Sequence, residues 1–188
     1  MTYIFRFAVT YDDGMAPNSQ DGTLSLLSCK PDVRLQARVG DWAIGYRSKR
    51  LGGLCFAGKV AQKLTIGDYQ TEFPDRRDAV YRRVAVSSNG EEQFERLRPD
   101  YHAKDDLWRK DIRGRYVLVF NPYWYWGCGG HNPPEFVVDM AHPYIGHARR
   151  ASVAQVQALE EWLATEPGGH LGEPCEPDVV KRRLCGGC

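Results

Sequence analysis

The stretch Ala37–Val60, ARVGDWAIGYRSKRLGGLCFAGKV, carries the clearest structural pattern in the chain. A short apolar run at Trp42–Tyr46 follows the turn residues Gly40 and Asp41, and a second apolar run occupies Leu54–Val60. The seven residues between the runs hold three cations and two adjacent glycines, so the connection is longer than a minimal hairpin turn. Two strand-length runs joined by a glycine-containing loop predict an antiparallel pair of strands.

Segments rich in aromatic and β-branched residues predict further strands, and we expect those near Tyr3–Thr10 and Arg115–Asn121 to share one curved sheet with this pair. The segment RYVLVFN is the clearest strand in the second half of the chain. We predict four further strands: Tyr3–Thr10, Thr23–Ser28, Val80–Val86 and Arg115–Asn121. The polar, turn-rich stretch Ser87–Asp106 is interpreted as a surface insertion, a kind of segment that is often functional or mobile in a compact domain.

Helices are predicted from apolar residues at helical spacing and from capping residues. Ser152 and Gln155 fit a capping box in front of an apolar stripe. Thr65 is a candidate N-cap for a short helix that runs toward Phe73. The predicted helical segments are Asp32–Ala37, Thr65–Phe73, Glu91–Leu97 and Ser152–Thr165.

Composition and charge restrict the class of protein. With 188 residues, of which 43% are hydrophobic and 12% aromatic, the chain is expected to form a folded domain with a real core. A net charge of +1 means that any nucleic-acid surface must be a local patch. No run approaches the ~20 apolar residues of a membrane span, and the first residues lack the apolar region of a secretory signal. Six cysteines without such a signal indicate reduced thiols or a metal in a cytoplasmic protein, rather than a disulfide framework.

The C-terminal end differs in composition from the rest. Because Gly172–Cys188 is rich in proline and glycine and has no apolar period, we place a domain at residues 1–168 and a cysteine-containing tail at 169–188. One histidine and three cysteines there form the donor set that tetrahedral zinc takes: His170, Cys175, Cys185 and Cys188. A structural zinc is one interpretation, and the other is a frayed tail without metal. No cofactor besides this zinc is indicated.

Several ordered blocks resemble known families. A Gly-Asp turn, an apolar strand, a basic loop and a glycine-rich returning strand resemble the core of the PUA-like superfamily and its EVE-type domains. The blocks Tyr11–Asn18, Cys29–Arg34, Val39–Trp42 and Val117–Gly127 look like the nucleotide modification associated domain proteins of bacteria and phages. The resemblance implies an α+β fold: a PUA-like, partly open β-barrel with peripheral helices. It also implies a link to DNA base-modification systems.

In the PUA-like superfamily such a hairpin lines a pocket for a modified base, and aromatic residues could stack on that base. The candidate nucleobase-binding residues are Asn18, Asp41, Trp42, Tyr46, Tyr123, Trp124 and Trp126. Alternation predicts that Tyr123 and Tyr125 share one face of a strand while the two tryptophans of that segment share the other. It also predicts that Trp42 and Tyr46 point the same way. The alternative is that the aromatic residues form the core, and that the two polar residues are a turn residue and a strand cap.

Cations near these residues are candidates for phosphate contacts. The candidate phosphate-binding residues are Arg47, Lys49, Arg50, His147 and Arg149. The alternative is that the first three belong to an ordinary solvated loop. No Walker A, G-x-S-x-G or G-x-G-x-x-G motif is present. A catalytic site would therefore need residues that meet only in space, for instance Cys29 as nucleophile with His147 as base.

Three functions remain open from the sequence. The first is recognition of a modified or flipped-out nucleobase in DNA or RNA, or of a related nucleotide. The second is an enzyme of DNA base or nucleotide modification, and the third is an interaction subunit that works with other base-modification proteins. A base reader predicts an aromatic pocket, an enzyme predicts a perturbed thiol, imidazole or carboxylate within it, and a subunit predicts an exposed apolar patch. No membrane partner is expected.

Overall fold

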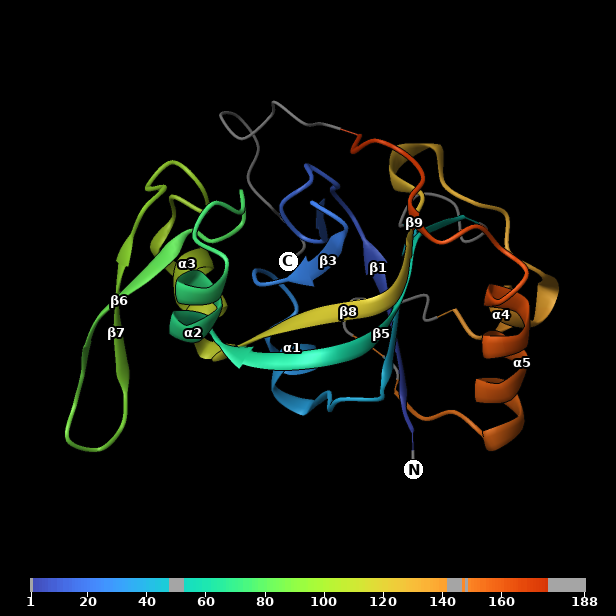
Figure 1. Cartoon of the computed structure of the whole chain (residues 1–188), viewed down its shortest axis with the longest axis horizontal. Helices are drawn as coiled ribbons and strands as arrows, with labels where there is room; N and C mark the ends of the chain where they lie inside the picture. The colour runs from blue at the N-terminus through green and yellow to red at the C-terminus, as the bar shows by residue number, and fades with distance from the viewer. Residues whose placement is uncertain (1, 48–52, 142–146, 148, 176–188) are drawn as a thin grey trace.

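A computed structural model describes residues 2–47, 53–141, 147 and 149–175 of the chain. The described part is a mixed α+β fold, with a seven-stranded mixed sheet in the order β1-β4-β5-β8-β3-β2 and β9 beside β8 (Figure 1). Its strands are β1 (Ile4–Val9), β2 (Asn18–Gln20), β3 (Thr23–Leu26), β4 (Trp42–Arg47), β5 (Leu54–Thr65), β8 (Tyr116–Tyr125) and β9 (Gly169–His170). Strands β6 (Tyr81–Val86) and β7 (Glu92–Arg96) form a separate ribbon. The helices are α1 (Pro31–Gln36), α2 (Ile66–Glu72), α3 (Asp105–Arg113), α4 (Glu135–Asp139) and α5 (Val153–Leu163), with a 3₁₀ turn, η1, at Gly127–Gly129.

The predicted central pair is confirmed, because β4 and β5 are antiparallel neighbours. Strand β4 also pairs in parallel with β1, which places the four strands β1, β4, β5 and β8 in one sheet, as expected. Gly45 in the middle of β4 has a packing reason. A Cβ atom there would lie 2.4 Å from the Phe56 ring of β5, so only glycine lets this ring lie against the strand.

Strand β8 is longer than predicted because it continues through Pro122. Proline lacks the N–H that a sheet ladder needs, so the sequence suggested that the strand ends at Asn121. In the structure Gly58 pairs with Tyr123 and Val60 with Phe120, and the pairing shifts between them. Asn121 and Pro122 therefore occupy an irregularity of the ladder, beyond which pairing resumes to Tyr125.

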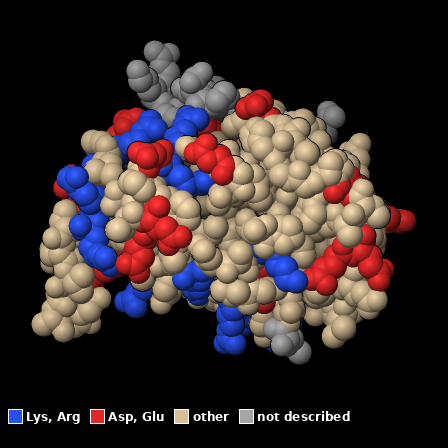
Figure 2. Space-filling model, in the orientation of Figure 1, with Lys and Arg blue, Asp and Glu red and all other residues tan. Residues whose placement is uncertain are grey.

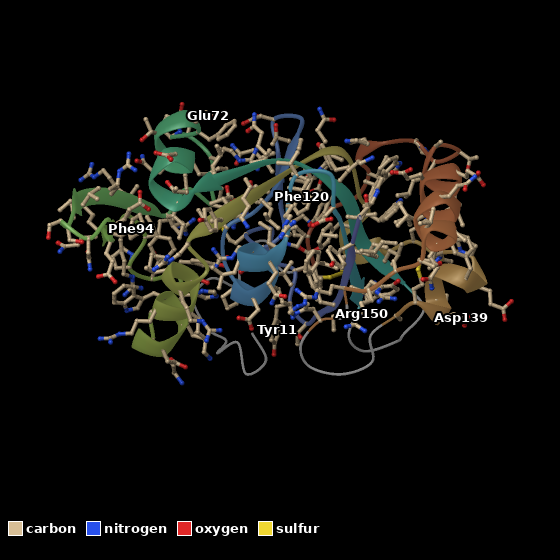
Figure 3. The ribbon with its side chains drawn as sticks, turned by 90° about the horizontal axis from the view of Figure 1, so that it is seen from below. Tyr11, Glu72, Phe94, Phe120, Asp139 and Arg150 are labelled. Carbon is tan, nitrogen blue, oxygen red and sulfur yellow. A yellow bond between two sulfur atoms is a disulfide. The ribbon has the colours of Figure 1, made fainter. Side chains whose placement is uncertain are left out.

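The sheet is curled around one part of the core. Although β1 and β3 are separated by three strands in the sheet order, Phe7 of β1 and Leu26 of β3 line the same small hollow. Phe120 of β8 packs in this cluster, and Figure 3 shows it at the centre of the molecule. Among the described residues, β1 and β2 remain the two ends of the hydrogen-bonded order, so these strands do not form a closed barrel.

Helices α4 and α5 cover the opposite face of β4 and β8. Leu159 and Leu163 of α5 pack with Trp42 and Ile44 of β4 in a second core cluster. The predicted capping box is present, because the Ser152 hydroxyl accepts from the Gln155 backbone N–H at 3.1 Å, and the Gln155 side chain accepts from the Ser152 N–H at 2.8 Å. The helix thus begins where the sequence indicated.

The other end of the sheet carries α2, α3 and the ribbon. The Thr65 hydroxyl caps α2 by accepting from the Asp68 N–H, as predicted. The prediction of a helix at Glu91–Leu97 is wrong, because these residues form β7, which pairs with β6. The turn Ser87–Gly90 contains Asn-Gly, a strong hairpin signal, and Gly90 has a φ of 82°. The predicted insertion Ser87–Asp106 therefore contains strand β7 and the first residues of α3. The sequence indicated neither of these two elements.

The division of the chain after residue 168 stays a prediction. Gly169–His170 pair in parallel with β8, so the described start of the tail lies against the main sheet. No helix among the described residues is long and apolar enough to cross a membrane.

Candidate functional site

The predicted aromatic residues are sorted onto faces as alternation requires, but all of them are core residues. Tyr123 and Tyr125 pack in the first core cluster. The second core cluster, under α5, holds four of the candidates: Trp42, Tyr46, Trp124 and Trp126. None of the candidate aromatic residues is more than 7% exposed. The core interpretation therefore describes where these side chains lie.

Polar contacts fix these rings in place. The Trp42 indole N–H donates to Glu160 Oε1 at 3.1 Å, and the Tyr46 hydroxyl donates to the Val137 carbonyl at 2.7 Å. The Trp126 ring stacks on His131, with centroids 4.9 Å apart. These partners come from α4, α5 and the segment after η1, so the aromatic residues join the covering helices to the sheet.

The Asn18 and Asp41 side chains are buried and bonded within the protein: Asp41 holds the entry to β4, and Asn18 begins β2 rather than lying in a turn. The Asn18 amide donates to the Gly14 carbonyl at 2.6 Å, and its oxygen accepts from buried Arg76 at 2.7 Å. The Asp41 carboxylate accepts from the backbone N–H groups of Tyr3 and Arg38, both at 2.8 Å. Both side chains are 3% exposed.

The candidate phosphate-binding cations do not gather at one described site. The Arg47 guanidinium donates to the Cys128 carbonyl, His147 lies against Phe5, and Arg149 donates to the Gln36 side chain. Lys49 and Arg50 lie outside the described residues. A phosphate-binding role for any of these residues stays a prediction.

The prediction of zinc at Cys175 is wrong in this structure, because Cys175 is bonded to Cys128. A disulfide sulfur is not the thiolate that zinc requires. His170 is hydrogen-bonded to Ser19 at 2.9 Å and lies 3.3 Å from Glu173, while Cys185 and Cys188 lie outside the described residues. Within the described part of the chain, no group of three or more histidine, cysteine or acidic side chains could hold a metal. The sequence suggested reduced thiols because it does not show that Cys128 and Cys175, with Cα atoms 4.5 Å apart, meet in space.

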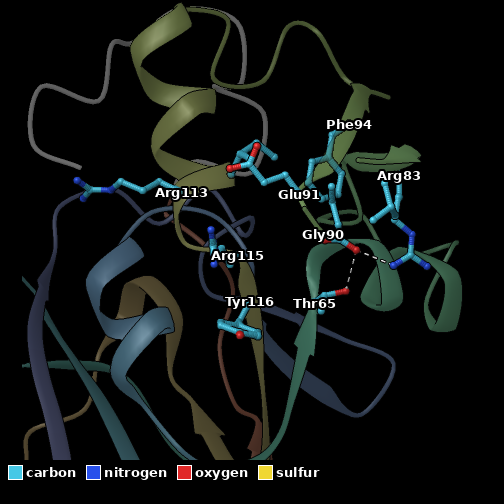
Figure 4. Close-up of a pocket in the computed structure, with 11 residues that line it drawn as sticks. Thr65, Arg83, Gly90, Glu91, Phe94, Arg113, Arg115 and Tyr116 are labelled. Carbon is cyan, nitrogen blue, oxygen red and sulfur yellow. Dashed lines mark hydrogen bonds and ion pairs between the residues drawn. The ribbon is translucent and has the colours of Figure 1, made fainter. Parts of the chain in front are cut away.

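A cleft of about 590 Å³ opens between the β6–β7 ribbon, the end of α3 and the start of β8. We call it the arginine cleft, and its lining consists of Thr65, Arg83, Val86, Gly90, Glu91, Glu92, Phe94, Ile112, Arg113, Arg115 and Tyr116. Figure 4 shows Arg115 and Tyr116 on one wall and Phe94 with Arg83 on the other, while the Arg113 side chain points away from the ribbon. The volume lies within the range of small-molecule and cofactor sites.

The two walls of the arginine cleft differ in charge. On the ribbon wall, Arg83 is paired with Asp68 at 3.1 Å and with Glu92 at 2.6 Å, so its charge is already compensated. On the opposite wall, Arg115 is exposed and forms no side-chain hydrogen bond or ion pair with another described residue. An anion would therefore be drawn to the Arg115 side.

The local backbone explains why Arg115 stands at this wall. Its φ of 56° lies in the left-handed region, which non-glycine residues adopt at a cost of ~1–3 kcal/mol. Its N–H donates to the Ile112 carbonyl at 2.9 Å, and its carbonyl accepts from the Ile66 N–H at 3.1 Å. These bonds join α3, β8 and α2 at one residue, and such retained strain is typical of functional positions.

Tyr116 presents a half-buried ring beside Arg115. The Lys63 ammonium lies 4.4 Å from the ring centroid and donates to the carbonyls of Leu35 and Ala37, both at 2.8 Å. Burial, followed by the neighbouring Arg38, lowers the pKa of Lys63. The ring is thus held by a cation on one side and contributes to the cleft lining.

The charge distribution separates the two ends of the molecule. On the face shown in Figure 2, basic and acidic side chains are interleaved over the end with α2 and β6, whereas the end with α5 is mainly acidic. Near α5, the Lys59 ammonium is paired with Glu160 at 2.8 Å, so its charge is compensated. An anionic ligand would therefore meet less like charge at the ribbon end than at the end with α5.

The arginine cleft was not predicted from the sequence, although two short sequence patterns point to parts of it. Asn89-Gly90 is a hairpin turn that places Phe94 across from α3. Arg113-Gly114-Arg115-Tyr116 puts two cations and an aromatic residue directly before a strand. The suggested pair of Cys29 with His147 is also not the arrangement seen, because the Cys29 sulfur lies against His102.

Comparison with known proteins gives one match. A family model described as nucleotide modification associated domain 2 matches residues 1–181. No curated protein and no solved structure matches the chain.

Proposed function

The chain belongs to the nucleotide modification associated domain 2 family, and from that premise we propose that it recognises a modified or flipped-out nucleobase, or a related nucleotide, in the arginine cleft. The family is associated with nucleotide modification, and its membership carries that context to this chain. The observation that carries the proposal is the cleft itself, which places a half-buried tyrosine beside an uncompensated arginine in a space of about 590 Å³.

Each lining group has a role that its chemistry supports. The Tyr116 ring, with Phe94 across the cleft, offers surfaces on which a base stacks, worth ~1–3 kcal/mol per base. Arg115 contacts the phosphate of that nucleotide. Glu91 is exposed at the cleft, and a carboxylate accepts from exocyclic amino groups of bases. The paired Arg83 serves to hold the ribbon against α2 through Asp68.

The fold supports the same proposal at a coarser level. We propose that the curled sheet is a PUA-like, partly open barrel, because β1 and β3 approach each other across a common core. In this proposal the base binds at the ribbon end and not at the central hairpin, because α4 and α5 enclose Trp42 and Tyr46. The sequence alone suggested the hairpin because it does not show which aromatic residues are covered.

A binding panel tests this function. Short DNA and RNA oligonucleotides, each with one plain, methylated or hydroxymethylated base, are titrated with wild-type protein at several stated salt concentrations. We expect measurable binding with a preference among the bases. Arg115→Gln should weaken binding to all members of the panel alike. It should also reduce the slope of log affinity against log salt concentration by about one, the value expected for one lost phosphate contact. Arg82→Gln is the matched control, because Arg82 is exposed on the ribbon and paired with Glu95 outside the cleft.

The result that overturns the proposal is equally specific. If no member of the panel binds at low salt, or if Arg82→Gln and Arg115→Gln lose affinity equally, the arginine cleft is not the site. An enzymatic function is the second candidate, and the surroundings of Cys29 favour it.

A further inference from the structure

The side chains of Cys29, His102 and Asp111 form a chain of contacts with His102 in the middle, although Cys29 is 73 positions before His102. The His102 Nε2 atom lies 3.9 Å from the Cys29 sulfur, within reach of a hydrogen bond to sulfur. Its Nδ1 atom lies 2.6 Å from Asp111 Oδ2. One ring nitrogen thus faces a thiol and the other faces a carboxylate. This is the geometric signature of a nucleophile, a base and the group that orients the base.

We call Cys29, His102 and Asp111 the Cys29 cluster. Hydrogen bonds and a ring contact from neighbouring residues fix its position. The Asp111 carboxylate accepts from the Cys29 N–H at 2.8 Å and from the Tyr81 hydroxyl at 2.8 Å. The Tyr101 ring stacks on the imidazole with centroids 4.2 Å apart. Because a carboxylate only accepts hydrogen bonds, a neutral imidazole here carries its proton on Nδ1 toward Asp111, and its Nε2 is then the acceptor that faces sulfur.

Backbone strain gathers at the same place. Among the described non-glycine residues, five have positive φ, and Cys29 at 59°, Lys30 at 41° and His102 at 46° are three of them. Left-handed backbone at such residues costs ~1–3 kcal/mol each and persists where the surroundings fix it, often at functional sites. Arg34 fixes it here, because its guanidinium donates to the Cys29 carbonyl at 2.9 Å and to the Asp111 carbonyl at 2.7 Å.

Cys29 is the most exposed member of the cluster. His102 and Asp111 are buried, whereas Cys29 is partly exposed. Cys29 lies beside a hollow of about 30 Å³ whose other walls come mainly from the end of β1 and from Leu26. Among the described residues, the charged and titratable groups that face the cluster include Asp13, Lys30, Arg34, Tyr81, Arg96 and Tyr101.

We propose that Cys29 is the nucleophile of an acyl-transfer reaction, with His102 as its general base and Asp111 as the positioning residue. The substrate class is a small acyl group, such as acetyl, on an ester or thioester, because the hollow of about 30 Å³ is too small for a nucleobase. His102 Nε2 takes the thiol proton while sulfur forms a C–S bond to the carbonyl carbon. The bond to the leaving group breaks, and the leaving group takes the proton from His102. Water, deprotonated by His102, then cleaves the thioester, releases the acid and restores the thiol.

A purely structural role would need fewer features. The hydrogen bond from the Cys29 backbone N–H to the Asp111 carboxylate is enough to join the segment after β3 to α3. That role does not require an imidazole between the carboxylate and a partly exposed sulfur. The two interpretations differ in reactivity, because only a paired thiol is activated.

The first test uses unmodified protein. Wild-type protein is treated with iodoacetamide across a range of pH, and the Cys29 peptide is quantified by mass spectrometry. At about pH 6.5 an ordinary thiol is only about 1% ionised, so the paired Cys29 should react at least about tenfold faster than a reference cysteine peptide. A profile that follows an ordinary thiol overturns the proposal. Cys55 is the internal control, because burial raises the pKa of its thiol to about 12.

The second test follows acyl transfer directly. With p-nitrophenyl acetate, wild-type protein should release one equivalent of nitrophenolate in a burst and gain one acetyl group on the Cys29 peptide. Cys29→Ser should abolish the burst, and His102→Gln should slow it by at least about a hundredfold. Folding of each variant is checked by circular dichroism, and Cys55→Ala should leave the burst unchanged. Acetylation of Cys29 at the same rate in folded His102→Gln contradicts the proposal. No nucleic acid is used, so this outcome is independent of the base-binding proposal.

Discussion

The Tyr125 hydroxyl contacts both carboxyl oxygens of Asp12 at 2.9 Å, deep between β8 and the loop that follows β1. Burial is the main reason that the pKa of Asp12 is raised to about 6 from its ordinary value of 3.8. The hydrogen bond from Tyr125 opposes this shift without cancelling it. The folded protein therefore holds a proton on Asp12 at pH values where the unfolded chain has lost it.

The first prediction concerns stability against pH. Between about pH 4 and pH 6 the folded state binds the extra proton, so the free energy of unfolding should fall as pH rises through this window. Above the window the loss is complete, at up to about 3 kcal/mol. Asp12→Asn keeps an oxygen that accepts from Tyr125 and removes the titration, so it should flatten this slope in urea unfolding. The neighbouring Asp13→Asn should keep it, and an unchanged slope in Asp12→Asn would reject this explanation.

The second prediction concerns Trp42. Because this ring is 2% exposed and packs under α5, Trp42→Ala should lower the free energy of unfolding by ~3–5 kcal/mol. Val153→Ala, at a position 84% exposed, should change it by less than ~0.5 kcal/mol. Urea denaturation measures both. A folded Trp42→Ala variant of normal stability that loses nucleic-acid affinity would instead return the base site to the central hairpin.

Local patterns predicted the parts of this fold that depend on local chemistry. The capping box at Ser152, the N-cap at Thr65 and the alternation along Tyr123–Trp126 are all confirmed. These features depend on neighbours within a few residues, so the chain displays them directly. The interpretation of Glu91–Leu97 as a helix is wrong because the Asn-Gly turn before it folds this segment back onto β6 as a strand.

The candidate sites were harder to predict because they depend on long-range contacts. Phe94 and Tyr116 line one cleft although they belong to a separate ribbon and to the main sheet. Cys29 meets His102 and not His147, since the turn before α3 brings His102, and α3 itself brings Asp111, against the segment that follows β3. Burial also decides which aromatic rings can form a binding site, and the sequence does not show which of them α5 will cover.

The third prediction concerns the disulfide. Cys128 and Cys175 close a loop of 47 residues, so reduction should lower the stability of the wild type by ~2–4 kcal/mol. Cys175→Ala should show the lower stability from the start and should not respond further to reductant. Peptide mapping under non-reducing conditions should recover the linked pair. Recovery of both peptides as free thiols from oxidised protein would contradict the pairing.

The central claim is that Tyr116 stacks on a nucleobase in the arginine cleft. The most direct measurement compares affinities of Tyr116→Ala and Tyr3→Ala for the preferred oligonucleotide of the panel. Tyr3 is a matched control, since it is also half-buried and has a cation, Arg149, over its ring at 5.6 Å, but it lies outside the cleft. We predict that Tyr116→Ala loses ~1–3 kcal/mol of binding and the preference for the modified base, while Tyr3→Ala keeps both. A folded Tyr116→Ala that binds and discriminates like the wild type would contradict the claim.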